Sequence, residues 1–331
     1  MRMHRLTRFT AAVAAFFMAG ATLPFDAPAR AGELGHYGPA IADIRDYVMP
    51  AKPGFATKLY TYYYSSDTFR NANGDKVSTI PLPGGGTVDI DVDVGIYVIA
   101  PAFLFISDWE VFGGHYGAYI LPTFGNSSVG ASLRTQTGLG RDVADSDFGV
   151  GDLFVQPLWL GWNWDHWDIT TGYGFYAPIG KFEQGAADNV GLGFWTHQLQ
   201  LAGAWYPWKE RGTAVVGAFT YEFNQEVEDS DVTPGQRASF NLGVSQYLPL
   251  GSSGFLLELG ALGYGQWQVT DDTGSDAFRP DVHDRLYGAG GQVGLTYLPW
   301  EAAATFKYTR DFGVEDRFEG DNFTLNFAVA F

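Results

Sequence analysis

The chain contains no cysteine among its 331 residues. This absence excludes disulfides, thiolate metal sites and cysteine nucleophiles. If the chain is exported to an oxidising compartment, where disulfides are a common source of stability, its stability has another origin. A closed β-barrel is one such origin, because each strand has two neighbours and no hydrogen-bonding edge is left bare.

Positive charge is also scarce. The chain has 20 Lys and Arg against 37 Asp and Glu, for a formal net charge of −17. Lys and Arg are the residues that bind nucleic-acid phosphates and anionic lipid headgroups. We therefore expect no nucleic-acid partner, and the charge argues against docking on an anionic membrane surface.

Beyond the N-terminus, no apolar run is long enough to cross a membrane as a helix. The N-terminus itself carries three arginines, the apolar stretch Phe9–Leu23 and the small-x-small site that ends at Ala31. This order is typical of a secretory signal peptide, residues 1–31, cleaved after Ala31. A membrane anchor helix is the alternative, disfavoured because the stretch is short and is followed by Pro24 and Pro28.

Aromatic residues, glycine and alternating polarity are abundant. The chain is 16% aromatic and has 43 Gly, and from Gly54 onward apolar residues recur at every second position. In the last eleven residues, for example, Phe323, Leu325 and Phe327 alternate with Thr324 and Asn326. Such alternation indicates strands with one apolar face and one wet face, as in membrane β-barrels.

This pattern gives twelve candidate strands, roughly 54–66, 87–106, 113–133, 150–163, 168–178, 192–205, 212–226, 236–249, 254–270, 284–298, 302–313 and 321–331. An even number is the rule for bacterial single-chain barrels. Long polar connections such as 67–86 and 134–149 alternate with short turns such as 164–167 and 250–253, which predicts outer loops and periplasmic turns. The fold class is therefore all-β, a transmembrane antiparallel barrel over residues 54–331 in the bacterial outer membrane.

Tryptophan supports this orientation. Seven of the ten Trp lie within three residues of an expected short turn: Trp109, Trp162, Trp164, Trp167, Trp205, Trp208 and Trp300. Indole rings prefer the headgroup level of a bilayer, so these residues predict an aromatic girdle on the periplasmic side.

Residues 32–53 differ from the rest. Ile41, Ile44 and Val48 have helical spacing after Pro39, and Pro50 and Pro53 follow them. We expect a short amphipathic helix ahead of the barrel. It is either a periplasmic leader, which we favour, or a plug inside the lumen.

Several segments resemble a known family. They are Gly35-His-Tyr-Gly-Pro-Ala-Ile-Ala-Asp-Ile, Met49-Pro-Ala-Lys-Pro-Gly-Phe55 leading into Tyr60–Ser66, Asp152-Leu-Phe-Val-Gln-Pro157 and Tyr176-Ala-Pro-Ile-Gly180. In these the chain resembles the "meta-pathway of phenol degradation" family of transporter-like outer-membrane proteins. The resemblance implies a barrel linked to uptake of aromatic or other hydrophobic compounds, and it supplies no catalytic residues.

The wet face of the strands supplies the candidate lumen and ligand residues. They are Thr196, Gln198, Gln200, Glu222, Glu258, Gln266, Lys307, Asp311, Thr324 and Asn326. Tyr60, Tyr62 and Tyr64 face either the lumen, as an aromatic track, or lipid. Phe331, an aromatic at the last position, is the expected signal for outer-membrane assembly by the barrel assembly machinery.

Other chemistry finds little support. No two His are spaced as metal ligands, and no strong nucleophile motif is present, so we expect no enzyme, cofactor or metal site. The acidic groups at 142–147, 226–231 and 271–276 are solvated loops, or sites where divalent cations bridge to lipopolysaccharide. The expected function is passive uptake of a small hydrophobic or aromatic ligand through outer-membrane lipid. The alternative is a structural or surface-binding barrel with a sealed lumen.

Overall fold

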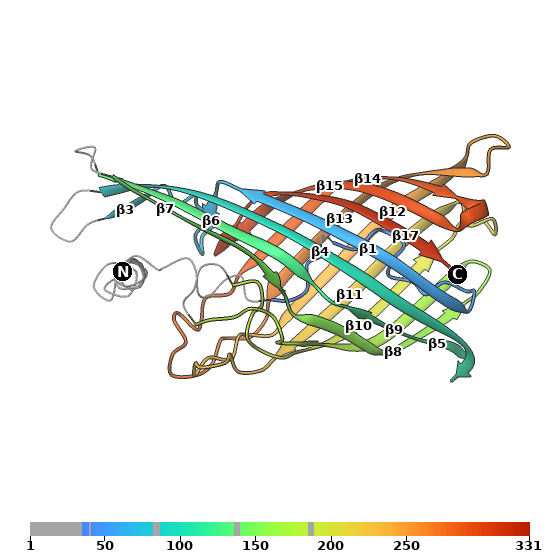
Figure 1. Ribbon diagram of the computed structural model, residues 1–331, viewed down its shortest axis with the longest axis horizontal. Helices are drawn as coiled ribbons and strands as arrows, with labels where there is room; N and C mark the ends of the chain where they lie inside the picture. Colours follow the sequence, from blue (N-terminus) through green and yellow to red (C-terminus); the bar gives the residue numbers. More distant parts are fainter. Residues whose placement is uncertain (1–34, 40, 82–86, 136–139, 185–188) are drawn as a thin grey trace, which may run out of the picture.

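The computed structural model describes residues 35–39, 41–81, 87–135, 140–184 and 189–331 (Figure 1). The expected signal peptide, residues 1–31, lies outside the described residues. In the described part of the chain, no helix is both long and apolar enough to span a membrane.

The strands close into a twelve-stranded antiparallel barrel. β1 pairs with β17 on one side and with β4 on the other, so the ring has no open edge. The wall consists of β1 (Gly54–Ser66), β4 (Thr87–Val111), β5 (Gly114–Leu121), β8 (Leu153–Asn163), β9 (Trp167–Ala177), β10 (Thr196–Trp205), β11 (Thr213–Asn224), β12 (Arg237–Pro249), β13 (Phe255–Gln268), β14 (Arg285–Tyr297), β15 (Ala302–Glu315) and β17 (Asp321–Ala330). The fold class and strand number predicted from alternation are confirmed.

One expected connection is wrong. The polar stretch 134–149 lies mostly in β6 (Phe124–Thr135) and β7 (Gly140–Val150), which pair with each other. β6 also pairs with the first half of β4, and β3 (Thr79–Pro81) pairs with the start of β4. These strands extend beyond the barrel at one end (Figure 1). Their polarity reflects water on both faces, because they have left the level where lipid demands an apolar side.

The two ends of the barrel differ. Short turns, including the 3-10 turn η2 (Leu298–Trp300), join strands at the end that also holds Gly54 and Phe331. Longer connections lie at the other end, where β2 (Phe69–Arg70) pairs with β16 (Arg317–Phe318). Short turns mark the periplasmic end of an outer-membrane barrel.

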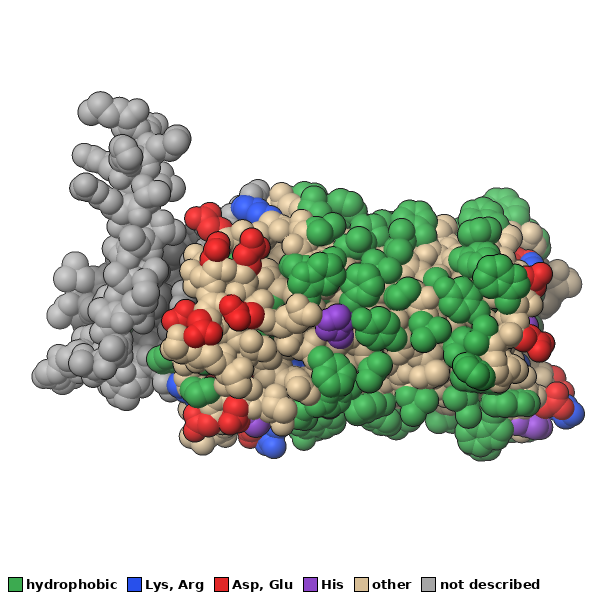
Figure 2. Space-filling model, turned by 90° about the horizontal axis from the view of Figure 1, so that it is seen from below, with side chains coloured by type: hydrophobic (Ala, Val, Ile, Leu, Met, Phe, Trp, Pro, Cys, Tyr) green, Lys and Arg blue, Asp and Glu red, His purple; other side chains and the backbone are tan. Residues whose placement is uncertain are grey.

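The outer surface is apolar across the middle of the barrel. Figure 2 shows hydrophobic side chains in a broad band, with acidic side chains at both ends. Leu199, Leu201, Phe306, Leu325 and Phe327 belong to this exposed set. The Trp residues at the short turns are exposed or half-buried, as a girdle requires. The band matches the hydrocarbon layer, so the chain is an outer-membrane barrel.

Residues 35–39 and 41–49 run inside the barrel, against the inner faces of the strands. The helix expected here is not found, because the described residues form turns, with Ile41 N–H bonded to Gly38 O and Asp46 N–H to Asp43 O. A helix would use the carbonyls of Ile41 and Ala42 internally. Here Lys307 donates to both carbonyls, and Gln292 accepts from Ile44 N–H. Side chains of the wall thus replace the partners that a helix would supply.

Candidate functional site

The candidate site is the lumen, where the wall meets the N-terminal segment, defined as residues 35–53. Of the ten residues predicted to face the lumen, nine are buried and Gln200 is half-buried. On β10, for example, Thr196 and Gln198 face inward, while Leu199 and Leu201 are exposed on the lipid side. Period-two alternation places the predicted residues on this inner face.

A charged cluster holds the middle of the N-terminal segment. Lys58 Nζ on β1 lies 2.6 Å from Asp43 Oδ2 and 2.6 Å from Asp46 Oδ1. Lys307 Nζ on β15 lies 3.6 Å from Asp43 Oδ1, and Asn326 donates to the same oxygen at 2.8 Å. Burial opposes ionisation of Asp43, but Lys58 and Lys307 outweigh it and hold the pKa of Asp43 below its usual value. Two predicted lumen residues, Lys307 and Asn326, are therefore among the groups that fix the segment.

Arg45 anchors the segment to a different part of the wall. Its Nε lies 3.3 Å from Glu258 Oε1 and donates to Ser245 Oγ at 2.7 Å. Its terminal nitrogens donate to the backbone carbonyls of Arg211 and Gly212. These contacts tie the segment to β12, β13 and the short turn before β11. Glu258, predicted as a lumen residue, is the carboxylate of this pair.

The first residues of the segment meet three more predicted lumen residues. Tyr37 N–H donates to Glu222 Oε1 at 2.9 Å, and Gln266 donates to Tyr37 O at 2.9 Å. The His36 ring contacts Thr196 Oγ1 at 2.8 Å through Nδ1 and Asp152 Oδ2 at 2.9 Å through Nε2. Asp152 also accepts from the backbone N–H of Gly180 and of Leu192, so it links the segment to the connection after β9.

Apolar contacts complete the fit. Ile44 packs on Gly243 and Gly260, where a Cβ on Gly243 would lie 2.8 Å from Ile44 Cγ2. Lower in the barrel, Met49 packs with Ile106 and Trp159. Glycine at 243 and 260 is therefore required by the close approach of the segment.

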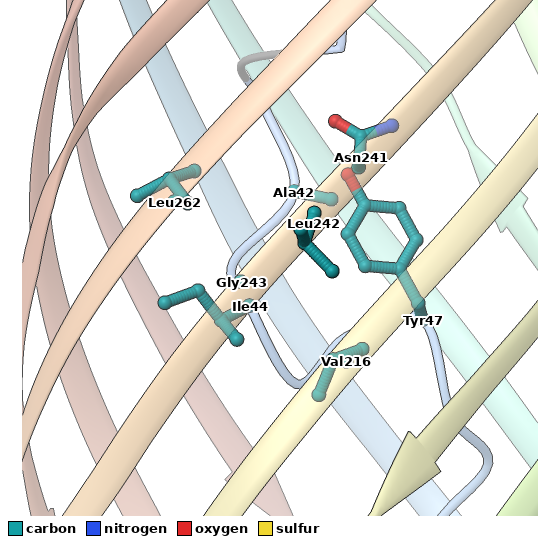
Figure 3. A pocket seen from close by; sticks show the side chains of 8 residues that line it. All are labelled: Ala42, Ile44, Tyr47, Val216, Asn241, Leu242, Gly243 and Leu262. Carbon is teal, nitrogen blue, oxygen red and sulfur yellow. The ribbon is translucent and has the colours of Figure 1, made fainter.

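A small hollow remains beside Ile44. Figure 3 shows its lining, with Ile44 and Tyr47 of the segment facing Val216 and Leu262 of the wall. The volume open to the centre of a water molecule is about 10 Å³, which is room for roughly one water. No organic solute fits in this hollow.

The remaining predicted residues lie on the inner face without contacting the segment through the bonds described above. Gln198 accepts from Tyr176 Oη, and Asp311 accepts from Tyr264 Oη and Asn322. Thr324 lies opposite Lys307 in the β15–β17 register. The prediction missed Lys58, His36, Asp43, Arg45 and Gln292. Lys58 precedes lipid-facing Leu59 in the period-two pattern of β1, and this alternation could have identified Lys58 as a lumen residue.

The sequence left open whether the three tyrosines of β1 face the lumen or lipid. Tyr60 and Tyr62 are on the lumen side, since their hydroxyls donate to Asp46 and Asn322. Tyr64, two residues further along the same face, is buried. His197 is on the opposite, lipid-side face and bonds to Tyr173 and Gln225.

The acidic connections bond to one another. Asp231 accepts from Ser275, and Asp276 accepts from Asp231 N–H, so two long loops are joined. No cluster of three metal-binding side chains occurs among the residues whose positions are described. The side chains at 142–147 lie outside the description.

Comparisons with known proteins agree with this architecture. An outer membrane channel from Pseudomonas putida F1 matches with a TM-score of 0.60 and 16% identity, covering 88% of this chain and 100% of that one. The β domain of the Bordetella autotransporter BrkA matches with a TM-score of 0.46 and 12% identity, covering 85% and 100%. No curated protein sequence matches the chain. A family model described as "Putative MetA-pathway of phenol degradation" matches residues 66–327. That match spans most of the sequence, and the chain belongs to this family.

Proposed function

We propose that the protein is an outer-membrane channel for passive uptake of small aromatic or other hydrophobic compounds. In the structure, its own N-terminal segment closes this channel. The observation that carries this proposal is the segment itself. It lies inside the lumen of a barrel whose family description names a pathway of phenol degradation. Side chains of the wall hold it by ion pairs and hydrogen bonds.

These contacts suit a removable closure better than a permanent core. The segment is bound mainly by polar groups, which water can satisfy when the segment leaves. It begins and ends outside the wall strands, so it can move without breaking a strand pair. Transport down a gradient then needs no cofactor, only displacement of the segment.

An engineered disulfide between the segment and the wall tests the proposal. Because the chain has no native cysteine, no other thiol can compete for this disulfide. A Cβ on Gly243 would lie 3.4 Å from Ile44 Cβ, close to the Cβ spacing of a disulfide. The double variant Ile44→Cys/Gly243→Cys, reconstituted in liposomes, should exclude small solutes when oxidised and admit them after reduction. The single variant Ile44→Cys, which keeps Gly243, is the control and should not respond to oxidant.

The alternative function is a structural or surface-binding barrel with a permanently sealed lumen. The many contacts that hold the segment favour it. That function predicts no solute entry and no planar-bilayer conductance in either redox state. Equal entry in both states would instead contradict the role of the segment as the closure.

A further inference from the structure

Six aromatic rings form one continuous row inside the barrel. From the long-loop end towards the short-turn end they are Phe194, His36, Tyr176, Phe154, Tyr119 and Trp159. Successive ring centroids are 5.0, 4.6, 4.5, 5.5 and 5.7 Å apart. Each spacing is within the range of favourable aromatic contact. The row, which we call the aromatic row, therefore has no break along its length.

The aromatic row lies on the lumen side of β5, β8, β9 and the residues before β10. Phe154, Tyr176, Phe194 and Trp159 are buried, while Tyr119 is half-buried. Rings on the lipid side of the same strands, such as Phe175, form separate pairs. Among the described residues of β5, β8 and β9, the inner rings form a continuous path along the barrel, whereas the lipid-side rings do not.

The N-terminal segment covers this path at both ends. Near the long loops His36, a residue of the segment, stacks on Tyr176. Near the short turns Met49 packs with Trp159. Displacing the segment would remove His36 and uncover Tyr176, Phe154, Tyr119 and Trp159, which are linked without it. A solute would meet these four rings in sequence.

Unpaired polar groups lie at the lower part of the row. Gln156 is 0% exposed, and neither its Nε2 nor its Oε1 has a hydrogen-bond partner among the described residues. Trp159 Nε1 lacks a partner in the same part of the structure. Gln156 lies opposite Tyr119 in the β5–β8 register, and Trp159 lies opposite Gly117. Buried polar atoms without partners are costly, so a group that bonds them on arrival is favoured.

We infer that the aromatic row is the path taken by neutral hydroxylated aromatic solutes, with Gln156 as the residue that binds the hydroxyl. This inference rests on the proposed function and names its substrate class and residues. Overlapping ring contacts let a planar solute exchange one partner for the next. A hydroxyl donates and accepts, as the Gln156 amide does. Asp152 and Glu222 flank His36 and Tyr37, which disfavours carboxylated rings.

Liposome swelling with matched glycosides tests the row. Phenyl and cyclohexyl β-D-glucopyranosides differ in aromaticity at nearly equal size, and neither crosses lipid readily. The wild-type barrel should admit the phenyl glycoside faster. The variants Phe154→Leu and Tyr119→Leu should each lower the phenyl-to-cyclohexyl rate ratio by roughly two- to tenfold. Phe175→Leu, which removes a lipid-side ring from β9, is the matched control and should leave the ratio unchanged.

A second experiment tests the binding of the hydroxyl by Gln156. The variant Gln156→Leu should keep the preference for phenyl over cyclohexyl but lose any preference for 4-hydroxyphenyl β-D-glucopyranoside over the phenyl glycoside. Retained cyclohexyl entry shows that each variant is folded and open. Equal wild-type rates for phenyl and cyclohexyl glycosides would overturn the aromatic row and leave uptake standing. No entry of any glycoside into the wild-type barrel would contradict the proposed function itself.

Discussion

Lys58 and Asp43 form an ion pair of 2.6 Å that joins the first barrel strand to the N-terminal segment. Both side chains are largely buried, with exposed fractions of 13% and 5%. Because the segment lies in the lumen just before β1 begins, two residues only fifteen positions apart can join it to the barrel wall.

The variant Lys58→Met should loosen the closure. It leaves Asp43 and Asp46 without their nearest cation, and removing one partner of a buried pair costs about 3–5 kcal/mol. We expect higher planar-bilayer conductance and faster cleavage of the segment by protease. Lys52→Met is the matched control, since Lys52 pairs with Glu301 at an exposed position and should be silent. Unchanged conductance in both variants would contradict a lock at Lys58.

The contribution of Asp43 to the closure should be insensitive to pH across the neutral and mildly acidic range. The pKa of Asp43 is lowered below its ordinary value of 3.8 by Lys58 and Lys307, which outweigh burial. A carboxyl group with a lowered pKa stabilises the bound state in full above its ordinary value, and this contribution is lost as pH falls through the lowered value. The difference in conductance between the wild type and Asp43→Asn should be the same at pH 7 and 5, and it should shrink only below about pH 4. A difference that shrinks between pH 7 and 5 would contradict this contribution of Asp43.

Gly243 should tolerate no side chain while Ile44 is present. In Gly243→Ala the new methyl group overlaps Ile44, and overpacking of this kind costs about 1–3 kcal/mol. We expect the segment to become sensitive to protease in this variant. Adding Ile44→Ala removes the overlap, so the double variant should be more protected than Gly243→Ala alone. A double-mutant cycle on protection gives the coupling, and additive effects would show that the two residues do not meet.

Phe331 should matter for assembly and not for the finished barrel. Its side chain is 75% exposed, and its backbone N–H bonds to Phe55 O at 2.8 Å. Phe331→Ser keeps that backbone bond and removes only the exposed ring. We expect less barrel in the outer membrane of cells, measured by fractionation, together with normal refolding into detergent. Phe112→Ser, which removes a ring that is 90% exposed at a turn, serves as the control. Equal loss in both variants would argue against a specific terminal signal.

The alternation of apolar and polar residues was sufficient to predict the strands of the barrel wall. The first strand, residues 54–66, and the last strand follow directly from alternation, and nine of ten predicted lumen residues are buried. The stretch 134–149 was misread because a strand outside the membrane has no apolar face to reveal it. Such a strand is recognised only through its pairing, as β6 with β7.

The sequence by itself determined that every second residue of the wall meets lipid and that the strands close, since the bilayer imposes period-two polarity and leaves no edge unpaired. Only the tertiary structure decided where residues 35–39 and 41–49 lie and that residues 41–48 form turns and bends in place of a helix. Their partners Lys307, Gln292 and Glu258 are more than two hundred positions away, and no local pattern encodes a contact at that separation. The aromatic row likewise joins residues of three strands, the connection before β10 and the segment, and it exists only because the barrel brings them to one wall.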